Sequence, residues 1–165
     1  MIELIVLDVD GTLTDGKITY TNSGDESKSF DVADGLAIAT WTKKLGKKVA
    51  IITGRTSKIV EKRASDLQIE YLYQNIHNKD EVLAEILKKE SLSWNQIAAI
   101  GDDLNDFKML KKAGLSFTPS NGTHYLKDFV DVICKNSGGN GAIREMIEYI
   151  VKKDNIEQEF INSWL

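Results

Sequence analysis

Six short apolar runs recur along the chain, each rich in β-branched, aliphatic or aromatic residues. They cover residues 2–7, 48–53, 71–73, 97–100, 115–117 and 130–133. Strands that are apolar at successive positions, rather than at every second one, are typical of sheets covered on both faces. The pattern therefore predicts a central sheet of buried, mostly parallel strands.

The segments between these runs carry apolar residues three or four positions apart, as the buried face of a helix requires. The predicted helices cover residues 34–45, 57–67, 80–90 and 107–113. We expect Asp34 to cap the first helix and Gly46 to end it. Alternating strands and helices predict a doubly wound, Rossmann-like α/β fold with helices on both faces of a parallel sheet.

Residues 16–30 interrupt this alternation. Two short arms flank Asn22-Ser23-Gly24-Asp25, which is typical of a β-hairpin turn. We expect the hairpin to project from the C-terminal edge of the sheet as a flap, in place of a cap domain. Residues 1–165 are predicted to form one domain, with the flap at 17–30 and a Gly-rich turn, helix and tail at 138–165.

Composition narrows the possible functions. The chain has 21 basic and 25 acidic residues, and a net charge of −4 argues against binding nucleic acid through its phosphates. An acidic chain that binds a phosphorylated substrate needs a metal ion or a few well-placed cations. The single cysteine, Cys134, cannot form an internal disulfide, and no signal peptide or membrane span is evident. We therefore expect a cytoplasmic protein.

Polar side chains cluster where four predicted strands end, the edge at which open α/β sheets bind ligands. In chain order the residues at these strand ends are Asp8, Asp10, Thr53, Gly54, Arg55, Lys79, Asp102, Asp103 and Asp106. Carboxylates brought together here repel one another unless a cation lies among them, and oxygen ligands suit Mg²⁺. Thr53 and Lys79 add a hydrogen-bond donor and a positive charge for a phosphoryl group. The pattern predicts a site for magnesium and phosphate.

Each of these motifs also has an ordinary structural explanation. Asp-Gly sequences commonly form turns at strand ends, and acidic residues are favoured at helix N-termini. Lys79 is equally compatible with a solvated charge at the start of a helix. Because four such coincidences at one edge of a sheet are improbable, we favour the functional interpretation.

The motifs resemble those of the haloacid dehalogenase superfamily of aspartyl phosphatases, over residues 2–132. The matching segments are Asp8-x-Asp10-Gly11-Thr12, Thr53, Lys79 and Gly101-Asp102-Asp103-x-x-Asp106, which stand in the order of the family's four motifs. A lone Asp-x-Asp is a weak signal, whereas all four motifs in this order at strand ends are a strong one.

The resemblance implies a role for each residue. Asp8 is the nucleophile and becomes an aspartyl phosphate, while Asp10 protonates the leaving group and then activates water. Mg²⁺ is bound by Asp8, by Asp102 and by the backbone carbonyl of Asp10, and Lys79 offsets phosphate charge. The remaining acidic residues hold waters or orient the lysine; these are Asp103 and Asp106.

Further segments resemble a capless subgroup, the 3-deoxy-D-manno-octulosonate 8-phosphate phosphatases, and relatives acting on nonulosonate (sialic-acid-like) 9-phosphates. These segments are the hairpin, residues 30–35, Arg63 and residues 138–145. The resemblance implies a sugar-acid phosphate as substrate and a homotetramer in which hairpins pack together and a neighbouring subunit covers the active site. Asp34 is a further candidate for substrate binding.

Three positions where that subgroup has arginines hold other residues, namely Ala33, Ala39 and Asn140. We therefore expect Arg55 and Arg63, with Arg144 as a further candidate, to meet the sugar-acid carboxylate. The two guanidinium groups would have to converge at the edge of the sheet. Because Arg63 also lies at helical spacing along an apolar face, a stem packed on that face with its head in water is an equally good interpretation.

Two other function classes are compatible with parts of this pattern. A receiver-type signalling module has a similar sheet, an acidic magnesium pocket and a phosphorylated Asp, but that Asp ends the third strand, where this chain has Tyr73-Gln74-Asn75. A non-catalytic interaction protein gives no reason for both Asp8 and Asp10. We expect a magnesium-dependent phosphatase, with octulosonate 8-phosphate as the favoured substrate and a nonulosonate 9-phosphate as the alternative.

Overall fold

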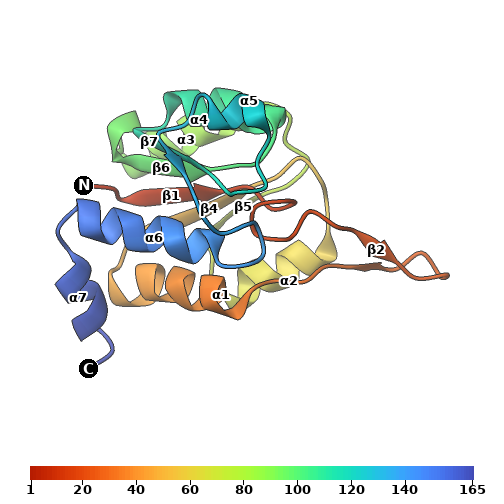
Figure 1. The fold of residues 1–165 in the computed structure, drawn as a ribbon, viewed down its shortest axis with the longest axis horizontal. Coiled ribbons are helices and arrows are strands. Elements are labelled where there is room, and N and C mark those ends of the chain that lie inside the picture. Colours follow the sequence, from red (N-terminus) through yellow and green to blue (C-terminus); the bar gives the residue numbers. More distant parts are fainter.

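The computed structural model describes residues 1–165 and has the predicted doubly wound α/β architecture (Figure 1). Six parallel strands form one sheet in the order β5-β4-β1-β6-β7-β8. The strands are β1 (Leu4–Leu7), β4 (Lys48–Ile52), β5 (Tyr71–Tyr73), β6 (Ile97–Ile100), β7 (Leu115–Thr118) and β8 (Val132–Ile133). Chain order reverses between β1 and β6, so the carboxyl ends of these strands form the crevice at which such sheets bind ligands.

Helices cover both faces of the sheet (Figure 1). One face carries α1 (Val32–Ala39), α2 (Lys58–Asp66) and α6 (Ala142–Lys153). The other carries α3 (Lys79–Glu90), α4 (Phe107–Lys112) and α5 (His124–Lys127). The remaining elements are the π-helical turn η1 (Thr40–Lys44), the 3₁₀ helices η2 (Trp94–Gln96) and η3 (Leu104–Asp106), and α7 (Glu157–Asn162). None of the helices combines the length and apolar character needed to cross a bilayer.

The central strand supplies both hydrophobic cores. Ile5 and Leu7 pack into the core beneath α1, α2 and α6, whereas Leu4 and Val6 pack into the core beneath α3, α4 and α5. Because successive residues of a strand point to opposite faces, a strand between two helical layers must be apolar throughout. This double burial explains the continuous apolar runs of the sequence.

The first helix departs from its predicted limits. α1 begins at Val32, and its N-cap is Asp31 rather than Asp34, because the Asp31 side chain accepts a hydrogen bond from the Asp34 backbone N–H at 2.9 Å. At its other end η1 turns Trp41 into the core, where its indole N–H donates to the Lys48 carbonyl at 3.0 Å. The α-helix therefore ends earlier than the sequence pattern predicts.

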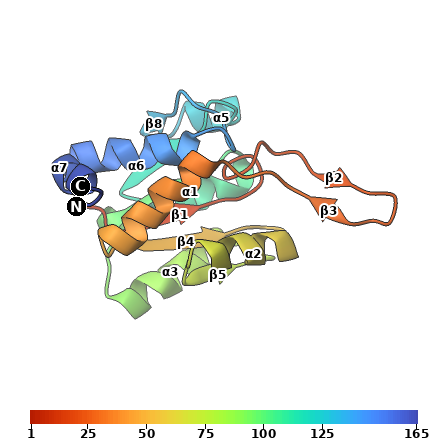
Figure 2. The same ribbon diagram turned by 90° about the horizontal axis from the view of Figure 1, so that it is seen from below.

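The hairpin consists of β2 (Thr19–Tyr20) and β3 (Glu26–Ser27), paired antiparallel. It extends beyond the sheet at the end opposite to both chain termini (Figures 1 and 2). Only two residue pairs join the arms, and a two-stranded ribbon this small is not stable by itself. Contacts with the rest of the molecule must therefore hold the hairpin in place.

The burial of Trp41 leads to a stability prediction. Trp41→Ala should lower the free energy of unfolding by about 3 to 5 kcal/mol, because the fully buried indole leaves a cavity and the Lys48 carbonyl loses its donor. Urea unfolding followed by circular dichroism measures the change. Trp164→Ala is the matched control, because removing the half-exposed Trp164 side chain should lower the free energy of unfolding much less. Equal losses for the two variants would contradict this description of the core.

Candidate active site

The carboxyl ends of β1, β4 and β6 surround a cavity of about 210 Å³ that no apolar side chain lines. Its lining residues are Asp8, Asp10, Thr53, Gly54, Arg55, Asp102, Asp103 and Asn105. All but Asn105 were singled out in the sequence. Asn105 occupies a variable position of the fourth motif, so its type alone carried no signal.

Asp8 and Lys79 form a buried ion pair at the floor of this cavity. The Nζ of Lys79, at the start of α3, lies 2.5 Å from Oδ1 of Asp8, and the lysine is only 1% exposed. Burial opposes the charged form, but the charges of Asp8 and Asp106 more than offset it and raise the pKa of Lys79. A fixed positive charge therefore lies beside the carboxylate of Asp8.

Carboxylate oxygens of Asp8, Asp102 and Asp106 all lie within 4.8 Å of one another. Burial and the neighbouring Asp8 charge raise the pKa of Asp102 to about 8, and the same two causes raise that of Asp106 to about 7. One lysine cannot neutralise three carboxylates, and an all-oxygen cluster of this kind fits Mg²⁺. Asp8 and Asp102 line the cavity and are the side chains able to hold the ion.

Asp106 is fully buried and acts on its neighbours from behind the cavity. Its Oδ1 lies 2.5 Å from Lys79 Nζ, and its Oδ2 accepts hydrogen bonds from the backbone N–H groups of Asp102 (3.1 Å) and Asp103 (3.4 Å). A side chain at Gly101 would collide with Asp106. The structure thus places Asp106 where it orients both Lys79 and the loop that carries Asp102. Asp103 itself caps η3 through the Leu104 N–H at 2.7 Å.

Glycine and threonine of the first motif make room for Asp102. Gly11 has a φ of +93°, and a Cβ at this position would overlap the Asp102 carboxylate. The hydroxyl of Thr12 donates to Oδ1 of Asp102 at 3.3 Å. The two residues after Asp10 therefore allow β1 and β6 to bring their carboxylates together, a function that motif spacing alone does not reveal.

Asp10 lies at the outer side of the cavity and contacts two cations. Its Oδ1 contacts the Nζ of Lys28, and its Oδ2 lies 3.8 Å from Nε of Arg55. Lys28 comes from the hairpin and was missed in the sequence. The signal that could have found it is the alternation Glu26-Ser27-Lys28, which places both charged side chains on one face of an extended arm.

The motif at the end of β4 lines the other wall. Thr53 is buried, and its hydroxyl accepts a hydrogen bond from the Arg55 backbone N–H at 3.5 Å. The guanidinium of Arg55 is half exposed, and its Nη2 lies 3.0 Å from Oε1 of Glu26. Thr53 therefore faces the interior of the cavity, and Arg55 its rim.

Arg63, Asp34 and Arg144 do not line the cavity, contrary to expectation. Nη2 of Arg63 donates to the Asp31 carbonyl at 3.0 Å, and its guanidinium lies 5.2 Å from the Phe30 ring. Within one chain it therefore does not converge with Arg55 at the cavity.

The Asp34 carboxylate is buried and accepts a hydrogen bond from the Arg144 backbone N–H at 2.8 Å. Asp34 thereby caps α6, whose own N-cap residue, Gly141, has no side chain. Burial foremost raises the pKa of Asp34 to about 6. Arg63 thus joins α2 to the start of α1, and Asp34 joins α1 to α6.

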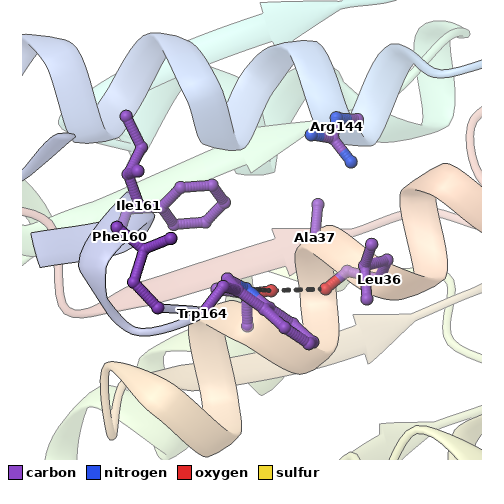
Figure 3. A pocket seen from close by; sticks show the side chains of 8 residues that line it. Leu36, Ala37, Arg144, Phe160, Ile161 and Trp164 are labelled. Atoms are coloured by element: carbon purple, nitrogen blue, oxygen red, sulfur yellow. Dashed lines mark hydrogen bonds between the residues drawn. The ribbon is translucent and has the colours of Figure 1, made fainter. Parts of the chain in front are cut away.

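A second cavity, of about 330 Å³, lies away from this edge, between α1, α6 and the C-terminal segment (Figure 3). Its lining residues are Leu36, Ala37, Thr40, Arg144, Phe160, Ile161, Trp164 and Leu165. The Trp164 indole N–H donates to the Thr40 hydroxyl at 3.1 Å and holds the C-terminal segment against α1. No acidic side chain lines this cavity.

Comparisons with known proteins found a matching family and similar enzymes. Residues 68–147 match the family model of haloacid dehalogenase-like hydrolases. The chain is 39% identical to the 3-deoxy-D-manno-octulosonate 8-phosphate phosphatase of Escherichia coli K12, over 91% of this chain and 79% of the relative. The Haemophilus influenzae enzyme is 35% identical over 92% of this chain and 83% of its own length.

Solved structures are similar over nearly the whole chain. The octulosonate 8-phosphate phosphatase of Moraxella catarrhalis, in complex with a magnesium ion, a phosphate ion and a KDO molecule, has a TM-score of 0.94 and 40% identity. The similarity covers 99% of this chain and 94% of the Moraxella catarrhalis chain. The enzyme from Yersinia pestis has a TM-score of 0.91 and 36% identity, over 95% of this chain and 84% of that one.

The raised pKa of Asp102 leads to a prediction about metal and pH. Folding raises this pKa from 3.8 to about 8, so the metal-free folded state binds the proton more tightly than the unfolded state, and its stability falls as pH rises between these values. Asp102→Asn should therefore raise the Tm of metal-free protein at pH 8 and abolish the rise in Tm that Mg²⁺ causes. Differential scanning fluorimetry at pH 5 and pH 8, with chelator or Mg²⁺, measures both effects.

The exposed Asp128 provides the control for this experiment, because Asp128→Asn should keep the full response to Mg²⁺. An Asp102→Asn variant that Mg²⁺ still stabilises as much as the parent would contradict the assignment of Asp102 as a metal ligand.

Proposed function

The chain belongs to the haloacid dehalogenase-like hydrolases, and within that family we propose that it is a magnesium-dependent phosphatase acting on 3-deoxy-D-manno-octulosonate 8-phosphate. The observation that carries the proposal is the placement of Asp8 between the buried Lys79 and the cavity-lining Asp102. Relatives 35–40% identical over most of this chain are phosphatases of that sugar acid. The same substrate is therefore the first choice for this chain.

The first half of the reaction transfers the phosphoryl group to Asp8. A carboxylate of Asp8 attacks phosphorus, the bond between phosphorus and the sugar oxygen breaks, and Asp10 gives its proton to the departing alkoxide. Lys79 offsets the repulsion between the anionic nucleophile and the anionic phosphate. Mg²⁺ held by Asp8, Asp102 and the Asp10 carbonyl neutralises charge on the phosphate oxygens when bound.

The second half returns the enzyme to its starting state. Asp10 takes a proton from a water molecule, the water oxygen attacks phosphorus, and the bond between phosphorus and Asp8 breaks. Inorganic phosphate leaves, and Asp8 is a carboxylate again. Thr53 lies in the cavity wall as a donor to the phosphoryl oxygens throughout, whereas the half-exposed Arg55 lies at the rim, where the carboxylate of a sugar acid would reach it.

A homotetramer in which hairpins of different subunits pack together is the second part of the proposal. Tyr20 on the hairpin is 60% exposed, and Val32 at the start of α1 is also exposed, so this part of the chain carries apolar surface that a neighbouring subunit could cover. The cavity is small and open, and a neighbouring subunit would exclude water from it.

The activity is tested by phosphate release. Octulosonate 8-phosphate should give a higher kcat/KM than nonulosonate 9-phosphates or hexose phosphates, and chelator should abolish turnover until Mg²⁺ is restored. Asp8→Asn should lower kcat by about 10⁴-fold or more because the attacking oxygen is lost. The exposed Asp15 gives the control, Asp15→Asn, with activity unchanged. Full activity of Asp8→Asn, or of the parent in chelator, would overturn the proposal.

The assembly is tested by light scattering at micromolar concentration. The parent should be a tetramer, and Ile18→Asp, which places a charge on a partly buried hairpin position, should shift it to smaller species with reduced kcat/KM. Lys17→Asp, at the exposed neighbouring position, is the control for added negative charge. A fully active monomeric parent would contradict both the packing of hairpins and the cover from a neighbour.

A further inference from the structure

An ion network joins the hairpin to the active-site cavity. The side chain of Lys28 is completely buried within one chain, and its Nζ contacts Oδ1 of Asp10 and lies 3.3 Å from Oε1 of Glu26. A buried lysine is costly unless it is paired, and both of its partners are carboxylates. One of them is the residue that must move the proton in the proposed reaction.

Glu26 fastens the other end of the network to the core. Its Oε1 lies 3.0 Å from Nη2 of Arg55, and its Oε2 accepts the Ser57 hydroxyl at 3.0 Å. Partial burial opposes ionisation, but the Ser57 hydrogen bond and the Lys28 and Arg55 cations hold the pKa of Glu26 below its usual value. The Glu26 carboxylate is therefore ionised, and it links the hairpin to the loop between β4 and α2.

Backbone geometry explains why both side chains reach the cavity. Glu26 and Lys28 are two residues apart on an extended arm, so their side chains lie on one face. Tyr20 pairs with Glu26 across the hairpin, and its hydroxyl lies 3.4 Å from Arg55. By contrast Lys17, on the other arm, is exposed and contacts only Asp15. The hairpin thus has an inner charged face and an outer solvated one.

We infer that Lys28 is a positioning residue that holds the Asp10 carboxyl group against the leaving oxygen of the substrate, with Glu26 holding Lys28 in place. This inference rests on the proposed phosphatase function. Asp10 follows the end of β1 in a loop, and the ion pairs of its side chain are with Lys28 and Arg55. Proton transfer requires hydrogen-bond distance to the leaving oxygen, so an Asp10 free to rotate would donate poorly.

Substrates that differ in leaving group distinguish positioning from simple support of the fold. The parameter kcat/KM reports formation of the phosphoryl-enzyme, in which Asp10 protonates a sugar alkoxide. The leaving group of p-nitrophenyl phosphate is a weakly basic phenolate that departs without a proton. Lys28→Met should therefore lower kcat/KM for the sugar phosphate by about 10²-fold, the range of general acid catalysis, and for p-nitrophenyl phosphate by only a few-fold.

Three further variants complete the experiment. Lys17→Met makes the same change on the outer face of the hairpin and should leave both substrates unaffected. Asp10→Asn should show the same dependence on leaving group, and adding Lys28→Met to it should cause little further loss, because the two residues act as one unit. Lys28→Gln replaces Lys28→Met if the apolar side chain prevents folding, as judged by circular dichroism.

Equal losses on both substrates, or no loss on either, would overturn the inference, since a structural role lowers all activities alike. A parent enzyme that hydrolyses another alkyl phosphate but not octulosonate 8-phosphate would refute the proposed substrate alone. In that case the comparison of leaving groups is made with the preferred alkyl phosphate and still decides the role of Lys28.

Discussion

Repulsion among three carboxylates in a buried site is the constraint on which the rest of the structure depends. Asp8, Asp102 and Asp106 bring oxygens within 4.8 Å of one another, and Lys79 supplies one positive charge among them. Burial, together with the unbalanced charge of Asp8, raises the pKa of Asp102 to about 8, and the cluster therefore favours a divalent cation. The binding site for a phosphate dianion is thus built from negative side chains, since metal and lysine reverse the sign of the local charge.

The hydrophobic sheet makes this concentration of charge possible. Leu7 at the end of β1 pairs in register with Ile51 of β4 and Ile100 of β6, so the residues after each strand emerge at one level. Burial of these strands on both faces provides the stability that offsets the cost of the carboxylates. Close approach at the edge then depends on positions without side chains, above all Gly11 beside Asp102. The geometry of the active site therefore depends on the packing of the hydrophobic core.

Strands, helices and most cavity residues were predictable because each depends on local sequence: an apolar run, a helical period, or a short motif at a strand end. The features that were missed depend on contacts between distant segments. The contact of Lys28 with Asp10 requires the second arm of the hairpin to return to the carboxyl edge of the sheet. Asp34 caps α6, more than a hundred residues away, and Arg63 turns toward the Asp31 carbonyl. Apolar spacing along one helix does not encode such contacts.

The most direct test of the central claim is to identify the residue that carries the phosphoryl group during turnover. Borohydride reduces an acyl phosphate on aspartate to homoserine, which peptide mass spectrometry detects. Enzyme quenched during turnover of a phosphomonoester in the presence of Mg²⁺ should contain homoserine at position 8, and enzyme without substrate should contain none. Reduction at another aspartate, or none at position 8 in enzyme that is turning over, would contradict Asp8 as the nucleophile.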